Sequence, residues 1–269
     1  MLGSIVGDIV GSIYEFANIK TKDFEFFQPE MERADDSILC IATADWLLHG
    51  GEVSHYYSRY ALEYPYPMGG YGGMFKAWSS KVARQGIHEP YNSCGNGSAM
   101  RIAPVGWAFE TEREVLEAAK VSASCTHNHP EGIKGAQATA LCIFLARQGH
   151  TASDIRARIE RDFGYDLSMS VKELQRRYSW QGIDGKGDGG ICQDSVPQAI
   201  ICALQAKDFE DAIRNAISIG GDSDTIGCIA GGIAEALYGI PESIKERAWK
   251  YLDETEGRTV RSFIQKYSI

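Results

Sequence analysis

Apolar residues recur at three- and four-residue intervals along most of this chain, which is the spacing of one face of an α-helix. The clearest run follows Thr225 and comprises Ile226, Ile229, Ala230, Ile233, Ala234 and Leu237. Gly239 and Pro241 then end the helix. The same pattern predicts helices over residues 38–48, 112–124, 130–147, 196–205 and 208–219. No alternating strand run of useful length is present, so the predicted fold is all-α.

Small residues recur at four-residue spacing near the N-terminus, at Gly3, Gly7 and Gly11. In a helix this spacing leaves one face nearly bare, so another helix or a ligand can approach closely. Glu15 continues the same face. Taken alone, the segment favours the alternative interpretation. In that interpretation the glycines only permit tight helix packing, and Glu15 lies on the protein surface.

Two glycine-rich stretches, residues 67–73 and 182–190, are predicted to be loops over the body of the protein. Neither is long or charged enough to act as a linker between domains. We therefore expect a single compact multi-helix domain over residues 1–269. The aromatic-rich segment 65–91 is also expected to be a loop.

Composition narrows the class of protein. The chain has 269 residues, of which 44% are hydrophobic, enough for a sizeable core. It has no apolar run of about 18 residues and no basic-then-apolar start, so neither a membrane span nor a signal peptide is expected.

Its 7 cysteines form no CxxC pair. Reduced thiols in a cytoplasmic protein are the expected state. A monomer is our expectation for the oligomeric state.

The net charge of −9 argues against a nucleic-acid backbone as the main partner. Part of this acidity lies in two clusters far apart in the sequence, Asp35-Asp36-Ser37 and Asp222-Ser223-Asp224-Thr225. Each precedes a helix-patterned run, and helix N-termini stabilise negative charge. Oxygen-only ligands select Mg²⁺, Mn²⁺ or Ca²⁺ over softer metals. The clusters therefore indicate a hard-cation site, although ordinary helix caps are the alternative for either one alone.

Two further segments carry polar groups of interest. The turn Gly95-Asn96-Gly97-Ser98 runs into a helix and offers backbone N–H donors to an anion, as phosphate loops do. The second is Thr126-His127-Asn128-His129-Pro130. Its two histidines could bind metal, cap the next helix or contact a ligand, and a zinc site is disfavoured because only two ligands are present.

In order along the chain, these segments resemble the motifs of the ADP-ribosylglycohydrolase family. The matching residues are Gly7-Asp8, Gly11 and Glu15, then Asp35-Asp36-Ser37, Gly95–Arg101, Thr126–Pro130 and Gly221–Thr225. The resemblance implies an all-α fold with two Mg²⁺ or Mn²⁺ ions. It also implies an activity, hydrolysis of the glycosidic bond between ADP-ribose and a modified side chain, most simply arginine. The implied substrate is an ADP-ribosylated protein or a small ADP-ribosyl compound.

The resemblance also implies roles for individual residues. Expected metal ligands are Asp35, Asp36, Asp222, Asp224 and Thr225. Expected catalytic residues are Glu15, Asp36 and Asp222. Expected substrate-binding residues are Asn96, Gly97, Ser98, Met100, His127 and His129.

One position departs from the family's pattern. Ala34 stands where the family usually carries a threonine ligand, so one metal would lose a protein oxygen. This departure supports an alternative, a catalytically weakened ADP-ribose-binding or structural relative of the crystallin-like kind. Another alternative is a dinuclear hydrolase of other ribosylated or phosphorylated small molecules, which would release phosphate rather than ADP-ribose.

Overall fold

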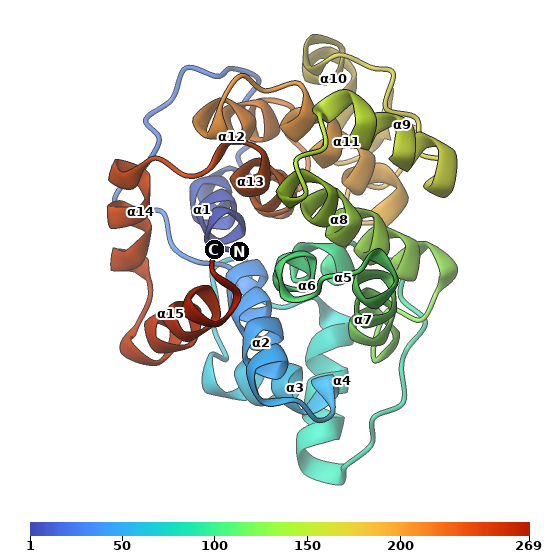
Figure 1. Cartoon of the computed structure of the whole chain (residues 1–269), viewed down its shortest axis with the longest axis vertical. Coiled ribbons are helices and arrows are strands. Elements are labelled where there is room, and N and C mark those ends of the chain that lie inside the picture. Colours follow the sequence, from blue (N-terminus) through green and yellow to red (C-terminus); the bar gives the residue numbers. More distant parts are fainter.

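A computed structural model describes residues 1–269 and is almost entirely helical (Figure 1). The α-helices are α1 (Leu2–Gly11), α2 (Asp35–His49), α3 (Val53–Glu63), α4 (Gly73–Gln85), α5 (Gly97–Met100), α6 (Ala103–Ala108), α7 (Glu112–Ser124), α8 (Pro130–Arg147), α9 (Ala152–Phe163), α10 (Val171–Arg177), α11 (Cys192–Leu204), α12 (Phe209–Ser218), α13 (Ser223–Tyr238), α14 (Glu242–Ala248) and α15 (Glu254–Tyr267). Short 3₁₀ turns are η1 (Ser12–Tyr14) and η2 (Trp249–Tyr251). Strands β1 (Tyr178–Ser179) and β2 (Gly182–Ile183) pair antiparallel. The predicted all-α class is confirmed.

Helices α1 and α13 lie side by side near the middle of the molecule, with α2, α8, α11 and α12 around them (Figure 1). They touch through backbone because glycines face each other. The facing positions are Gly3 with Gly231, Gly7 with Gly227, and Gly11 with Asp224. Residue numbers rise along one helix as they fall along the other, so the pair is antiparallel. The end of α1 therefore lies beside the start of α13, where one of the acidic clusters stands.

Gly7→Ala is expected to destabilise the protein. A Cβ at position 7 would lie 1.9 Å from the carbonyl oxygen of Gly227, so the two helices would have to separate. Overpacking of this kind costs about 1–3 kcal/mol of unfolding free energy, which denaturant titration would measure. Gly73→Ala is the matched control because no atom lies within 4 Å of a Cβ there. Equal stability of the two variants would contradict the packing argument.

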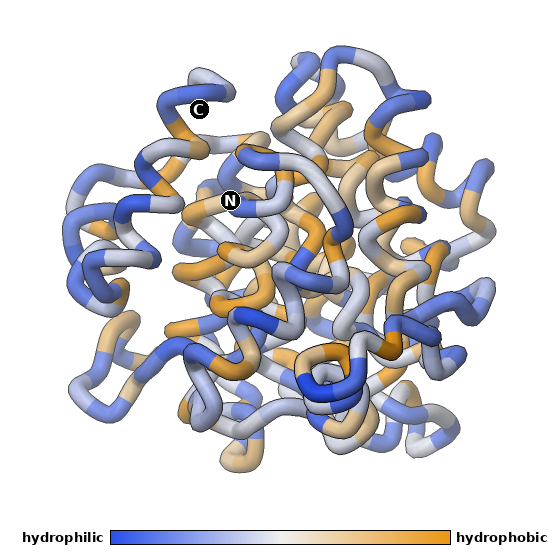
Figure 2. The backbone as a smooth tube through the Cα atoms, turned by 90° about the horizontal axis from the view of Figure 1, so that it is seen from below, coloured by the Kyte–Doolittle hydropathy of each residue, from blue (hydrophilic) through white to orange (hydrophobic).

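The hydrophobic core is one continuous cluster of 73 buried residues. Figure 2 shows the hydrophobic stretches of the backbone gathered toward the middle and the hydrophilic stretches on the outside. All seven cysteines are free, and five of them are buried. No helix combines the length and the hydrophobicity that a membrane crossing requires.

The structure has helices that the apolar pattern did not predict, among them α3, α9, α10, α14 and α15, and α2 begins at Asp35 rather than at residue 38. Segment 65–91, expected to be a loop, contains the whole of α4. Helix α11 begins at Cys192, before the predicted start at 196, and carries Pro197 in its interior. The segment expected to be a loop over 182–190 includes β2, which is too short to show alternation. Helices α7 and α8 have the predicted bounds.

Candidate metal centre

The start of α2 is fixed to α1 by a buried carboxylate, that of Asp8. Its oxygens accept hydrogen bonds from the backbone N–H of Ala34 at 3.0 Å and of Ser37 at 3.2 Å, and also from the Ser37 hydroxyl. Two of the otherwise unpaired N–H groups at the helix start are thus satisfied by another helix. This contact holds the acidic cluster of α2 next to the end of α1, and therefore next to the start of α13.

Carboxylates from all three helices converge at this point. Asp8, Asp36 and Asp224 form one group in which the ligand atoms lie within 4.8 Å of one another. Glu15, Asp222 and Asp224 form a second group by the same measure. Asp224 belongs to both groups, so the two clusters are joined through a single side chain.

The carboxylates of these two groups lie close together without a positively charged partner, so a bound cation would stabilise them. None of their carboxylates forms an ion pair with a lysine, arginine or histidine. Burial raises the pKa of Asp8 to about 7, although hydrogen bonds from Ser37 and Ala34 oppose the shift. Burial, with repulsion from Asp222 and Asp8, also raises the pKa of Glu15 to about 7. Burial and neighbouring carboxylates raise the pKa of Asp36 and of Asp224 well above the ordinary value.

The residues present fit a divalent cation. Oδ1 of Asp36 is buried and has no hydrogen-bond partner, which is costly for a charged oxygen unless a cation meets it. All ligand atoms on offer are oxygens, as Mg²⁺ and Mn²⁺ prefer. The Thr225 side chain opposes the rise in the pKa of Asp36 and lines the same cavity as Asp36. Asp35 lines the same cavity but belongs to neither tight group.

Glu15, Asp36, Asp222 and Asp224 line a cavity of about 550 Å³, a size typical of small-molecule and cofactor sites. The side-chain amide of Asn96, which also lines this cavity, donates to Asp222 at 2.7 Å. The turn that carries Asn96 is held by segment 189–192, because the backbone N–H of Asn96 donates to the carbonyl of Gly190 at 3.0 Å. Gly69 and Gly70, both with positive φ, also line the cavity.

The predicted substrate-binding residues fall into two sets. Asn96, Gly97, Met100 and His127 line the cavity. Burial lowers the pKa of His127 well below its ordinary value, with Arg101 adding to the effect, so this imidazole is neutral.

Ser98 and His129 are not among the cavity-lining residues. Ser98 is fully buried, and its hydroxyl donates to the carbonyl of Gly132 at 2.7 Å. His129 is the N-cap of α8, where Nδ1 accepts from the N–H of Glu131 at 3.1 Å. Both side chains thus hold the start of α8, and the structure does not bring them together with the rest of the site.

Comparison with known proteins identifies the family. The sequence model of ADP-ribosylglycohydrolases matches residues 1–267. The chain belongs to the ADP-ribosylglycohydrolase family. ADP-ribosylhydrolase ARH3 of Homo sapiens is 29% identical to it, with 95% of this chain and 89% of the relative covered. ADP-ribosylarginine hydrolase Tri1 of Pseudomonas putida is 26% identical, with 93% and 73% covered.

A solved structure titled "ADP-ribosylglycohydrolase-related protein complex" shares the fold of this chain. Its TM-score is 0.68 at 24% identity, with 98% of this chain and 95% of that chain covered. The family resemblance of the motifs is therefore confirmed, and with it the enzyme class, ADP-ribosylglycohydrolase. The hydrolase names of the relatives do not favour the non-catalytic alternative.

Sequence reasoning missed two contributors to the glycohydrolase site. Asp8 lies within the quoted N-terminal motif, but its spacing from Asp36 and Asp224 is visible only after folding. Trp180, in the β1–β2 turn, donates from Nε1 to the backbone carbonyl of Glu15 at 2.8 Å and stacks on Phe16 at 6.3 Å. It holds the chain that carries Glu15 after α1 has ended at Gly11. No motif in the sequence signals this role of Trp180.

Proposed function

We propose that the protein hydrolyses the glycosidic bond between ADP-ribose and a modified side chain, most simply arginine, with two Mg²⁺ or Mn²⁺ ions as cofactors. The proposal rests on Asp36, Asp222 and Asp224, which belong to two carboxylate groups joined at Asp224 and line the same cavity as the Asn96 turn. The name of the relative Tri1, an ADP-ribosylarginine hydrolase, supports the arginine linkage. The match of the family model to residues 1–267 supports a single domain over 1–269.

The two carboxylate groups sharing Asp224 are the candidate holders of the ions. We assign Asp36 and Asp224, with Asp8 beside them, to one ion, and Asp222 and Asp224 to the other. Thr225 and Asp35 are the further candidate ligands at the cavity wall. When bound, such ions would fix the ribose hydroxyls and offset the charge of the pyrophosphate.

The chemistry itself requires one proton to move. Hydrolysis forms a bond from the water oxygen to the anomeric carbon and breaks the bond from that carbon to the leaving nitrogen. The carbon passes through an oxocarbenium-like transition state, which buried carboxylates stabilise. We assign the transfer of this proton, from the attacking water to the leaving nitrogen, to Glu15, because its half-buried carboxyl lines the cavity beside Asp222 and Asp224.

Substrate binding falls to the other cavity residues. Asn96 and Gly97 present an amide and a backbone N–H to the ribose and pyrophosphate. Neutral His127 stands behind this turn, with Nε2 at 3.2 Å from the position of a Cβ on Gly97. A side chain at position 97 would crowd the imidazole, so the close approach of the turn to His127 favours glycine at residue 97.

The linkage is tested by incubating the protein with arginine-linked and with serine-linked ADP-ribosylated peptides, in Mg²⁺. We expect free ADP-ribose from the arginine-linked peptide at the higher kcat/KM. Release from the serine-linked peptide alone would keep the glycohydrolase assignment and overturn the arginine assignment.

Ala34→Thr is expected to tighten metal binding about tenfold and to raise turnover. Residue 34 is the N-cap of α2 and has an extended backbone, with φ −94° and ψ −171°, which threonine adopts readily. Its new hydroxyl would stand beside Asp8 and the metal groups. Calorimetric titration with Mn²⁺ measures the change. Ala34→Val is the control of equal shape without the hydroxyl, and an equal effect of both substitutions would rule out coordination by residue 34.

Glu15→Gln is expected to lower kcat by about 10²–10⁴-fold while ADP-ribose binds almost as before. The amide keeps the size of the side chain and removes its ability to take a proton. Steady-state kinetics and calorimetric titration with ADP-ribose give the two quantities, and Glu25→Gln, on the exposed surface, is the control. If Glu15→Gln lowered turnover and ADP-ribose binding to the same extent, Glu15 would only contact the ligand and would not transfer the proton.

A further inference from the structure

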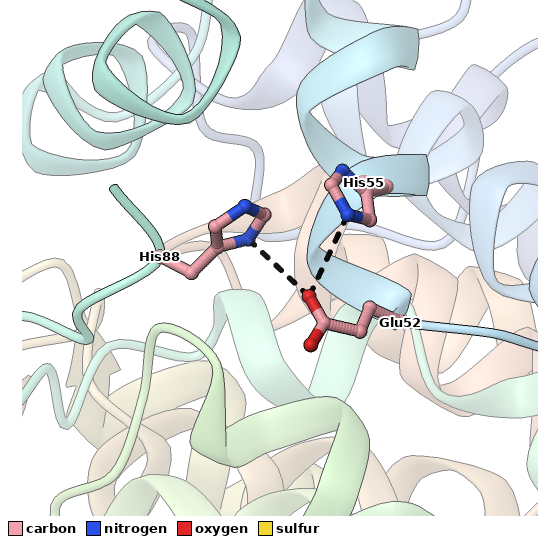
Figure 3. A group of neighbouring side chains, drawn as sticks. All are labelled: Glu52, His55 and His88. Atoms are coloured by element: carbon pink, nitrogen blue, oxygen red, sulfur yellow. Dashed lines mark ion pairs between the residues drawn. The ribbon is translucent and has the colours of Figure 1, made fainter. Parts of the chain in front are cut away.

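A third group of side chains that could hold a metal ion lies apart from the two acidic groups. Glu52 and His55 stand at the start of α3, and His88 lies on the segment after α4 (Figure 3). Their ligand atoms lie within 4.8 Å of one another. None of the three lines the glycohydrolase cavity.

The spacing within this group does not suit direct hydrogen bonds. Nε2 of His55 is 3.6 Å and Nδ1 of His88 is 3.7 Å from the same oxygen of Glu52, and both distances exceed a hydrogen bond. Figure 3 shows the two imidazoles turned toward that carboxylate from different segments. Around a tetrahedral zinc ion with bonds of about 2.0–2.1 Å, neighbouring ligand atoms are about 3.4 Å apart. The observed separations are close to that value.

The donor set also differs from that of the acidic cavity. Two imidazoles and one carboxylate are the ligands of several zinc sites that leave a fourth position to water. Imidazole suits zinc, copper and nickel, whereas Mg²⁺ prefers oxygen. The side chains of Glu52 and His55 are 69% and 63% exposed, so an ion can enter from solvent without any rearrangement of the fold.

One contact orients the site. The buried Ser54 hydroxyl lies 2.7 Å from Nδ1 of His88 and holds the ring beside α3. Coordination by this nitrogen replaces the serine contact. The ring centroids of His55 and His88 are 4.6 Å apart at an interplanar angle of 75°, and each ring presents one nitrogen to the same Glu52 oxygen.

We propose that Glu52, His55 and His88 bind a divalent transition-metal ion of the zinc class. The ion joins the start of α3 to the segment that runs from α4 toward Tyr91, which lines the cavity. A bound ion would therefore fix the segment that leads to the substrate-binding turn against the start of α3. This site is separate from the Mg²⁺ or Mn²⁺ centre.

The test is a Zn²⁺ titration of the whole protein followed by ¹⁵N NMR of the histidine side chains. Saturating Mg²⁺ is present throughout, so that the acidic cavity is occupied by a cation that does not compete for imidazole. We expect the imidazole signals of His55 and His88 to shift together and the other histidines to stay unchanged. His88→Ala and Glu52→Gln should each weaken Zn²⁺ binding about 10–100-fold, with Mg²⁺-dependent hydrolysis unchanged.

His49→Ala is the matched control, because His49 also faces a carboxylate, with Nδ1 2.7 Å from Asp45, but has no second imidazole in its group. It should keep the wild-type affinity for Zn²⁺. Shifts spread evenly over all the exposed histidines, or wild-type affinity in His88→Ala, would overturn the proposal. Neither result would bear on the glycohydrolase assignment, which is read from hydrolysis in Mg²⁺.

Discussion

Asp224→Ala is expected to abolish hydrolysis, with kcat/KM lowered by at least about 10³-fold, a loss of roughly 4 kcal/mol of transition-state stabilisation. Asp224 is the one residue common to both carboxylate groups, so its removal weakens both ion sites together. It stands in the first turn of α13, where the helix is already packed against α1. We therefore expect the helical fold to persist, as circular dichroism would check.

Two comparisons separate this effect from a general loss of structure. Glu242→Ala removes an acid from the first turn of α14 that belongs to no metal group and does not line the cavity, and it should leave activity unchanged. Calorimetric titration with Mn²⁺ should show that Asp224→Ala loses binding at both ions. Full activity of Asp224→Ala would contradict the shared-ligand arrangement, and loss of a single ion would assign the residue to one group only.

The second large effect concerns pH. The ordinary pKa of Asp or Glu in an unfolded chain is about 4, whereas Asp8 and Glu15 in the folded, metal-free protein titrate at about 7. Between these values the folded state holds protons that the unfolded state has released. The unfolding free energy therefore falls as pH rises from about 4 to about 7. Below about pH 4 and above about pH 7, Asp8 and Glu15 no longer change the unfolding free energy as the pH changes.

Metal reverses this trend because it binds the ionised carboxylates. The stabilisation by Mg²⁺ should grow from pH 5 to pH 8 and reach about 2.7 kcal/mol when Mg²⁺ is about 100 times its Kd. Denaturant unfolding in EDTA and in Mg²⁺ at each pH gives the increment directly and cancels the titration of the remaining groups. An increment that is the same at pH 5 and pH 8 would show that the ions do not compete with protons at this cluster.

Much of the fold was predictable because its signals are local. The bounds of α7 and α8 follow from apolar periodicity, and the glycine spacing of α1 indicated a close approach by another helix. Helix α4 was missed because its sequence is rich in glycine and aromatic residues before position 76, which resembles a loop. The interior Pro197 similarly hid the first turn of α11, because proline is more usual at a helix start.

The site was predictable only as far as its motifs extend. The acids of α2 and α13 stand at helix starts, so their sequence context carried information about their surroundings. Asp8 is different, because it faces Asp36 and Asp224 only as a result of how α1 packs against α2 and α13. Ser98 belongs to a motif by position, yet its side chain turns away from the cavity to bond Gly132. A motif identifies a segment, and packing decides which of its side chains reach the ligand.

The most direct test of the account is release of free ADP-ribose from an arginine-ADP-ribosylated protein, measured in Mg²⁺, in Mn²⁺ and in EDTA. We predict release with either metal, loss of release in EDTA, and recovery when metal is returned. Release that is equally fast in EDTA would contradict the metal centre assigned to Asp36, Asp222 and Asp224. No release from either the arginine- or the serine-linked substrate, with ADP-ribose still bound, would contradict the hydrolase assignment.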